Sequence, residues 1–500
     1  MLHLYDTRTR TAQDISPMDG KTLRFYCCGP TVYGPAHIGN FRTFVMQDVF
    51  RRVLELGGVP TTHIRNLTDV DDKTIRDSQK AGVSLAEFTA GWADLFHRDC
   101  AALNCLPPHA EPSAVGHIPE QIRMVQTLVE KGHAYVSEDG SVYFRISSFP
   151  EYGRLSHLDE RELDLGKTAN TRSNADEYEK DSVADFVLWK SRRPEDGNNF
   201  WPSPWGEGRP GWHLECSAMI HKYFGNDFDL HSGGVDLVFP HHENEVAQSR
   251  CACGGGFARL WFHITHLLVD GGKMSKSLGN VVNPDDVIKA YGADTMRLYI
   301  MFIGDFEKVA TWSDEAVKGS KRFLDRCWNL MDMAKDSEAL SEKNEAIIHK
   351  TIRKVTQDID ELKMNTAIAA LMTMVNELYA NGLTKGDLEA LLRMLSPFAP
   401  HMVEEMWELE GFAKKYGKMA MQMSWPEYDE SKTVASSVEM AVQVGGKLKG
   451  TITVPVDSDQ ESVVEAAKAN EKVAKAIAGM QIVKVIHVKN KLVNLIVKPC

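Results

Sequence analysis

The stretch LRFYCCGPTV (residues 23–32), followed closely by HIGN (residues 37–40), decides the fold of this 500-residue chain. The first stretch alternates and runs into a loop rich in Gly and Pro, as a strand does before a helix. A helix is expected over about residues 41–56, and an apolar strand at residues 61–64 follows the Gly57-Gly58 pair. This strand–loop–helix–strand order predicts a βαβ unit, and hence an α/β fold with a parallel sheet.

The length of the chain predicts several domains rather than one core. A Rossmann-like domain is expected over residues 1–107 and 211–305, with residues 108–210 as an insertion that carries short strands at 134–136 and 141–144. Long helical patterns follow from residue 313 to about 406, and they predict a helical domain over residues 306–430.

The C-terminal residues 438–500 predict a small α+β domain. Its strands are expected near residues 440–444, 451–454, 483–488 and 492–497, and its single helix near residues 461–478. From Glu439 onward nine lysines face only six acidic residues. Such a local basic surface is compatible with RNA binding.

The composition excludes several classes of protein. With 43% hydrophobic and 25% charged residues the chain reads as an ordinary globular protein. A net charge of -12 argues against a general nucleic-acid coat protein. No signal peptide or membrane-spanning run is evident, so we expect a cytoplasmic protein without a membrane partner. In that compartment its nine cysteines are expected to be buried, metal-bound or reactive.

The HIGN element sits where a strand hands over to a helix. A helix N-terminus presents free N–H groups and the positive end of a dipole, which suits an anion. Gly39 would allow a nucleotide to approach the backbone closely, and His37 and Asn40 could donate hydrogen bonds to it. An ordinary tight turn would look the same, so this element alone is a weak indication.

A second element, GGKMSKSLGN, spans residues 271–280. Its two glycines form a hinge, and Lys273, Ser275 and Lys276 surround a site for polyphosphate. A lysine acts here as a movable charge that follows the charge developing on leaving pyrophosphate. Together, in this order, the two elements resemble the signature pair of class I aminoacyl-tRNA synthetases.

Four further motifs narrow the resemblance to cysteinyl-tRNA synthetases. They are YCCGPTVY (residues 26–33), RNLTDVDDK (65–73), GWHLECSAM (211–219) and FPHHENE (239–245). The similarity covers about residues 4–302. One departure is Asn40, where many family members have a second histidine, and either side chain can donate to the nucleotide.

The resemblance implies a zinc ion bound by Cys28, Cys216, His241 and Glu245. The spacing of four puts His241 and Glu245 on one face if the segment is helical, and two thiolates with two harder ligands suit zinc. Zinc would select the substrate thiol over the hydroxyl of serine, because an apolar pocket separates near-isosteres only about 10- to 200-fold. Cys27 competes with Cys28 as a ligand, and we expect Cys251 and Cys253 not to bind metal.

The amino-acid pocket is also carried over from the family motifs. Trp212 is expected to form an apolar wall, and Thr68 and Asp236 are candidates for holding the α-amino group. The remaining expected pocket residues are Gly29, His213 and His231. A lone histidine is often only structural, and that reading stays open for both histidines.

The back half resembles a different enzyme, leucyl-tRNA synthetase. The similar segments are residues 312–313, 322–328, 349–355, 397–401 and 425–426 in the helical part, and residues 442–450 and 491–497 in the tail. The resemblance implies that Lys447, Lys449, Lys489 and Lys491 contact tRNA phosphates without reading sequence.

These features together predict a cysteine–tRNA ligase that acts as a monomer on L-cysteine, ATP with Mg²⁺, and tRNA(Cys). His37, Lys273 and Lys276 would stabilise pyrophosphate as cysteinyl adenylate forms. Three alternatives remain: a ligase that joins cysteine to a small amine, a non-catalytic RNA-binding paralogue, and an enzyme that activates leucine.

Overall fold

The computed structural model describes residues 2–158, 172–173, 184–269, 272–274, 280–434 and 437–499. Its contacts divide the chain into two compact units: residues 1–331, 355–369 and 392–425 form the first, and residues 332–354, 370–391 and 426–500 form the second. The predicted fold class, a parallel-sheet domain with an insertion followed by helices and a small α+β domain, is confirmed. The boundaries proposed for the individual domains stay predictions.

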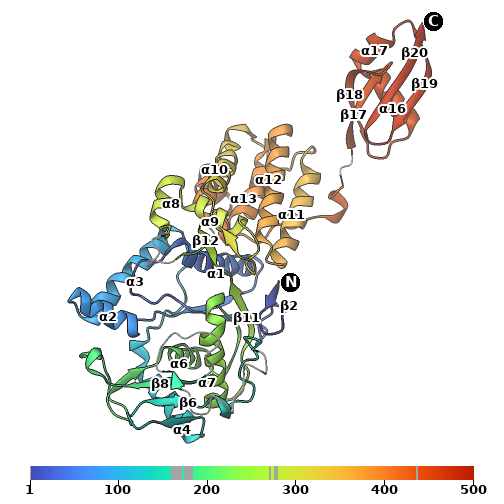
Figure 1. Ribbon diagram of the computed structural model, residues 1–500. Coiled ribbons are helices and arrows are strands. Elements are labelled where there is room, and N and C mark those ends of the chain that lie inside the picture. The colour runs from blue at the N-terminus through green and yellow to red at the C-terminus, as the bar shows by residue number, and fades with distance from the viewer. Residues whose placement is uncertain are drawn as a thin grey trace. The chain divides into compact units, whose positions relative to one another are not determined.

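The first unit is built on a four-stranded parallel sheet with the order β11-β10-β3-β4. Its strands are β3 (Leu23–Cys27), β4 (Thr61–Arg65), β10 (Asp227–Gly234) and β11 (Phe257–Ile264). Helix α1 (Ile38–Leu56) joins β3 to β4, so the predicted βαβ unit is confirmed (Figure 1). Side chains that follow the carboxyl ends of parallel strands meet at one edge of such a sheet.

Helix α1 begins at Ile38, three residues before the expected start, because His37 caps it. The His37 ring Nδ1 accepts from the Asn40 backbone N–H at 3.3 Å, and Asn40 Oδ1 accepts from the His37 backbone N–H at 3.0 Å. This reciprocal cap satisfies two N–H groups at the helix start.

Helices and short sheets surround the central sheet. Besides α1, the described helices that lie wholly in the first unit are α2 (Asp72–Ala81), α3 (Leu85–Ala102), α4 (Ile118–Glu130), α6 (Trp212–Phe224), α7 (Glu243–Cys253), α8 (Pro284–Tyr291), α9 (Ala293–Phe302), α10 (Asp314–Asn329), α14 (Pro400–Leu409) and α15 (Phe412–Tyr416). The small sheets pair β1 (His3–Asp6) with β2 (Thr11–Asp14), and β12 (Leu267–Val269) with both β13 (Gly272–Lys273) and β14 (Ala310–Thr311). No helix within the described residues is both long and apolar enough to cross a membrane.

The insertion forms a sheet of its own. It comprises β5 (Ala134–Val136), β6 (Val142–Phe144), β7 (Arg172–Ser173), β8 (Asp185–Ser191) and β9 (Gly208–Pro210). The two expected strands correspond to β5 and β6. Helix α4 packs against α6 and α7 (Figure 1). Apolar side chains of the insertion and of these helices share one buried cluster. The insertion thereby supports the helices that carry the candidate site.

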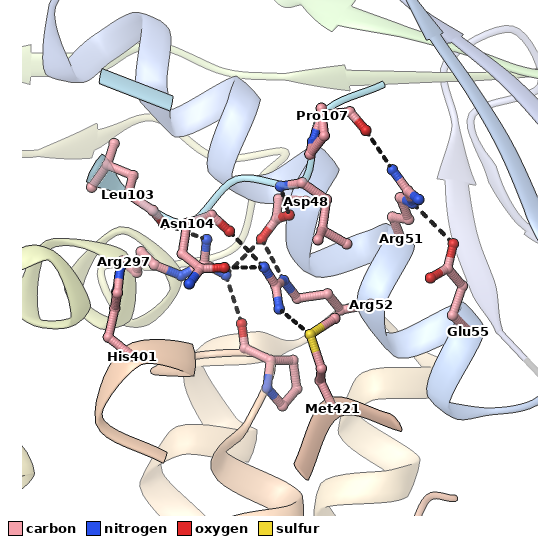
Figure 2. A network of polar contacts seen from close by, with 12 residues as sticks. Asp48, Arg51, Arg52, Glu55, Leu103, Asn104, Pro107, Arg297, His401 and Met421 are labelled. Carbon is pink, nitrogen blue, oxygen red and sulfur yellow. Dashed lines mark hydrogen bonds and ion pairs between the residues drawn. The ribbon is translucent and has the colours of Figure 1, made fainter. Parts of the chain in front are cut away.

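A buried ion-pair network fixes the C-terminal half of α1 (Figure 2). Asp48 is 2.8 Å from Arg52 Nε and 2.7 Å from Arg297 Nη2 of α9, and it also accepts from the Leu106 backbone N–H at 2.7 Å. Arg52 donates to the Asn104 carbonyl, and Arg297 donates to the Leu103 and Pro397 carbonyls. All three charged side chains are at most 4% exposed. Because these contacts join different segments, the network ties α1 to α9 and to the loop after α3.

Helices α11 (Glu345–Asp360), α12 (Met364–Asn381) and α13 (Lys385–Leu395) contribute residues to the second unit, as do the short strands β15 (Ala334–Lys335) and β16 (Leu383–Thr384). The predicted run of helices after residue 313 is therefore confirmed. Asp387 accepts from the Ser341 N–H and from Asn344 Nδ2, which holds the loop before α11.

The C-terminal part of the second unit is a four-stranded sheet with the order β18-β17-β20-β19. Its strands are β17 (Ser437–Val444), β18 (Lys447–Pro455), β19 (Met480–Val488) and β20 (Leu492–Pro499). The single helix expected over residues 461–478 is wrong, because the structure has α16 (Gln460–Ala469) and α17 (Glu471–Ile477). Asn470 is extended between them, and its side chain accepts from the Lys472 and Val473 backbone N–H groups. An asparagine cap restarts the helix in a new direction.

Candidate active site and metal centre

Four donor side chains converge near the carboxyl end of β3. Cys28 follows β3 directly, Cys216 lies in α6, and Glu245 lies in the first turn of α7. His241 belongs to the π-helical turn η5 (Val238–His242) immediately before α7. All four side chains are buried, and the carboxylate of Glu245 is fully so.

The donor atoms of these four residues lie within 4.8 Å of one another. Cys28 Sγ is 4.0 Å from Cys216 Sγ and 3.9 Å from Glu245 Oε1, and His241 Nε2 is 3.0 Å from Glu245 Oε1. A tetrahedral zinc ion with bonds of about 2.3 Å to sulfur separates two sulfur ligands by about 3.8 Å. The donor set therefore fits a zinc ion in both chemistry and spacing.

The cluster is electrostatically prepared for a cation. A hydrogen bond from Cys28 lowers the pKa of the Cys216 thiol to about 6, whereas burial raises the pKa of the Cys28 thiol. Burial alone would raise the pKa of Glu245, but His231 and His241 outweigh it and lower this pKa to about 2. Burial alone would lower the pKa of His241, but Glu245 and Cys216 outweigh it and raise this pKa to about 10. A bound metal replaces such a proton, since its ligands must be deprotonated.

Aromatic and imidazole rings fix the orientation of the donors. His231 Nε2 is 2.8 Å from Glu245 Oε2, and Trp261 stacks on the His231 ring at 4.6 Å. Trp212 stacks on the His241 ring at 4.3 Å, and His213 Nδ1 is 3.0 Å from His241 Nδ1. The structure thus brings His213, His231 and Trp212 to the candidate metal ligands, where outer contacts of this kind orient ligand rings.

His242 was missed by sequence reasoning. Its Nε2 is 3.2 Å from Cys28 Sγ, and its Nδ1 is 2.7 Å from His263 Nε2. Cys28, His231, His242 and Glu245 form a second group with metal-ligand spacing, which shares two residues with the first. Two adjacent histidines, His241 and His242, were the available signal for a further donor. A single sequence does not show which of the two rings points toward Cys28.

The residues beside the Cys28 loop lie close to the cluster through the backbone. Gly29 N–H donates to Asn66 Oδ1 at 2.9 Å, and Asn66 Nδ2 donates to the Thr68 hydroxyl at 3.3 Å. Thr68 is buried and its N–H donates to the Pro30 carbonyl at 3.1 Å. Asp236, by contrast, is exposed, in the short helix η4 (Val235–Leu237).

The HIGN element (residues 37–40) meets Met274 of the second predicted element at the first turn of α1. Gly39 faces Met274, because a Cβ built on Gly39 would lie 2.9 Å from Met274 Cε. The His37 Nδ1 atom accepts a hydrogen bond, so the neutral ring carries its proton on Nε2, the atom suited to donate to a phosphate. Lys273 lies in β13, while Ser275 and Lys276 lie outside the described residues.

Comparison with known families agrees with this geometry. The model of tRNA synthetases class I (C) catalytic domain matches residues 14–322, and that of the anticodon-binding domain of tRNA ligase matches residues 345–465. The cysteine–tRNA ligase of Opitutus terrae is 48% identical over 400 residues, covering 79% of this chain and 85% of the relative. The chain belongs to the cysteine–tRNA ligase family. A second member, from Protochlamydia amoebophila, is 40% identical over 409 residues, covering 79% of this chain and 84% of the relative.

This cysteine–tRNA ligase family member shares its fold with other class I enzymes. The agnB2 LeuRS of Agrobacterium radiobacter K84, solved as a ternary complex with tRNA and LeuAMS, superposes with a TM-score of 0.63 at 16% identity. The superposition covers 97% of each chain. At this identity the likeness concerns the fold alone.

The other cysteines of this cysteine–tRNA ligase family member lie outside the metal-type clusters found among the described residues. Cys27 is the last residue of β3 and is fully buried, and burial raises the pKa of its thiol. Cys251 and Cys253 lie at the end of α7.

In the tail, Lys447, Lys449 and Lys491 are exposed, and exposed Lys489 is 3.2 Å from Asp457.

Replacing Gly29 by alanine is expected to destabilise the protein by about 1–3 kcal/mol. A Cβ on Gly29 would lie 1.7 Å from the Asn66 carbonyl oxygen, so the backbone that carries Cys28 must move. Chemical denaturation measures the stability. The control is Gly91→Ala in α3, where a Cβ meets nothing within 4 Å. Equal stability of the Gly29→Ala variant and the unsubstituted protein would contradict the described loop geometry.

Proposed function

We propose that this protein is a cysteine–tRNA ligase that activates L-cysteine with ATP, transfers it to the 3′ end of tRNA(Cys), and uses zinc to select the substrate thiol. The observation that carries this proposal is the buried cluster of Cys28, Cys216, His241 and Glu245 in a chain of the cysteine–tRNA ligase family. When bound there, zinc supplies a soft Lewis acid that prefers a thiolate sulfur to a hydroxyl oxygen.

The chain's own residues would do the rest by positioning. Trp212 and His213 hold the His241 ring, and Gly29 and Thr68 line the loop beside Cys28. His37, through its Nε2 proton, and Lys273 and Lys276, through their charges, would stabilise the pyrophosphate that leaves ATP with its Mg²⁺. Gly39 and Asn40 shape the helix start at which the nucleotide would bind.

The tRNA would be bound by the helices after residue 305 and by the tail. Lys447, Lys449, Lys489 and Lys491 are the proposed phosphate contacts, and Lys489 would have to leave Asp457 to make one. We propose that the protein works as a monomer in the cytoplasm.

Pyrophosphate exchange with cysteine, serine and leucine tests the proposed function. We expect exchange with cysteine, far less with serine, and a loss of the cysteine-dependent signal after a chelator removes the metal. Charging of tRNA transcripts with cysteine and leucine anticodons exchanged then shows which tRNA is used. Leucine-dependent exchange would overturn the assignment, and a protein inert toward every amino acid would favour a non-catalytic role.

A further inference from the structure

The second predicted nucleotide-binding element is the GGKMSKSLGN segment (residues 271–280). The chain before and after it contacts the first turns of α1. The Ile38 N–H donates to the Val282 carbonyl at 3.1 Å, and Gly39 faces Met274. Strand β12, which precedes the element, also contacts α1. The position of Lys273 relative to His37 therefore depends on how α1 is joined to β12 and its neighbours.

Arg42 makes that join. Its side chain is fully buried, and its Nη1 atom donates to the Thr265 and His266 carbonyls at 3.0 and 2.9 Å. Its Nη2 atom donates to the Asp305 and Lys308 carbonyls at 3.0 and 3.2 Å. The first two carbonyls lead into β12 and the other two lead into β14. One guanidinium thus joins the segments that lead into the parallel strands β12 and β14. Strand β13, which carries Lys273, pairs with β12 in the same small sheet.

Arg42 differs from the buried arginines of the Asp48 network, because backbone carbonyls and not a carboxylate hold its side chain. Within the described part of the chain, Arg42 has no carboxylate within ion-pair distance; its acceptors are carbonyl oxygens and the Thr265 hydroxyl. Burial lowers the pKa of Arg42 to about 10, offset in part by Glu307, so the group is still charged at neutral pH. A buried cation without an ion-pair partner is costly, and an apolar side chain would avoid that cost.

We propose that Arg42 is a positioning residue that sets the strand carrying Lys273 against the N-terminus of α1, so that both nucleotide elements act on one ATP. The inference rests on the proposed function. Arg42 acts through the backbone it binds, and the candidate metal ligands lie on β3, α6 and α7. Its loss should therefore lower the rate of adenylate formation and leave cysteine binding and zinc content unchanged. A lysine cannot replace it, because only a planar fork reaches four carbonyls on two segments.

The test compares Arg42→Lys, Arg42→Gln and Arg42→Met with Arg52→Lys in the full chain. Arg52 is a matched control, since it is buried on the same helix but belongs to the Asp48 network of Figure 2. In pyrophosphate exchange we expect kcat to fall roughly 10- to 100-fold in the Arg42 variants, because a displacement of about 1 Å costs that much. The KM for cysteine should stay within about twofold of its original value, and Arg52→Lys should keep its kcat.

Hydrogen exchange of residues 264–269 and 272–274 supplies a readout independent of activity. We expect faster exchange there in Arg42→Lys, with β10 unchanged, and no such change in Arg52→Lys. Four results would each overturn the positioning role. They are an unchanged kcat in the Arg42 variants, an equal loss of kcat in Arg52→Lys, a parallel rise in the KM for cysteine, and unfolding of all three Arg42 variants. If the unsubstituted protein shows no cysteine-dependent pyrophosphate exchange, the proposed function fails. Hydrogen exchange of the backbone amides then still decides whether Arg42 positions the strand.

Discussion

The Cys216→Ser variant is expected to lose stoichiometric zinc and, with it, most of the preference for cysteine over serine. Cys216 is 2% exposed and its sulfur lies 4.0 Å from that of Cys28, so serine would put a harder oxygen where a thiolate is required. Even changes to outer contacts of a metal site lower affinity about 10- to 100-fold, and loss of a ligand should exceed that.

The measurement combines elemental analysis with the ratio of kcat/KM for cysteine and serine in pyrophosphate exchange. Without the metal the ratio should fall to what an apolar pocket provides, roughly 10- to 200-fold at most. Cys253→Ser is the control, because this partly buried cysteine lies outside both candidate metal groups. A Cys216→Ser protein with full zinc content and unchanged preference would exclude the thiol-selecting metal while leaving cysteine activation possible.

A second large effect is expected from Asp48→Ala, which should lower the free energy of unfolding by about 3–5 kcal/mol. The carboxylate is the shared partner of Arg52 and Arg297, two side chains that are at most 1% exposed (Figure 2). Its removal leaves two guanidinium groups buried without their counter-charge. Urea denaturation of the full chain measures the change.

The acid dependence of stability provides a second check on Asp48. Burial would raise the pKa of Asp48, but Arg297 and Arg52 outweigh it and hold this pKa below its ordinary value of 3.8. A lowered carboxyl pKa contributes stability that is present above about pH 4 and is lost as the pH falls toward the folded-state value. Asp48→Ala should therefore lose less stability than the unsubstituted protein over this acid range.

The exposed pair Glu315 and Lys318 on α10 serves as the control for Asp48. These side chains are 2.6 Å apart but mostly exposed, so Glu315→Ala should leave the denaturation midpoint unchanged. If Asp48→Ala and Glu315→Ala behaved alike, the buried network would not hold α1 in the way described.

The sequence predicted the main course of the fold because the deciding signals are local. The β3–α1–β4 unit follows from an apolar run, a Gly/Pro loop and a helical period, all within residues 23–65. The four strands of the tail were likewise predicted. The start of α1 was missed because it depends on a histidine that caps, a use of this side chain that composition alone does not indicate.

The candidate site was predictable only as far as its motifs reached. Cys28, Cys216, His241 and Glu245 were selected together through a resemblance, since residues from three separate segments carry no common periodicity. The inward turn of His242 and the carbonyl contacts of Arg42 could not be predicted in this way. Both depend on contacts between segments that lie more than 200 residues apart in the chain.

The core of the C-terminal sheet has a consequence for how such a chain can arise. Among the described residues, the apolar cluster between this sheet and helices α16 and α17 is drawn entirely from residues 438–497. A segment that fills its own interior can be transferred between genes as a cassette, without redesigning what precedes it. Residues 438–497 therefore complete this described interior by themselves, and an exchange of the whole segment would leave the interior intact.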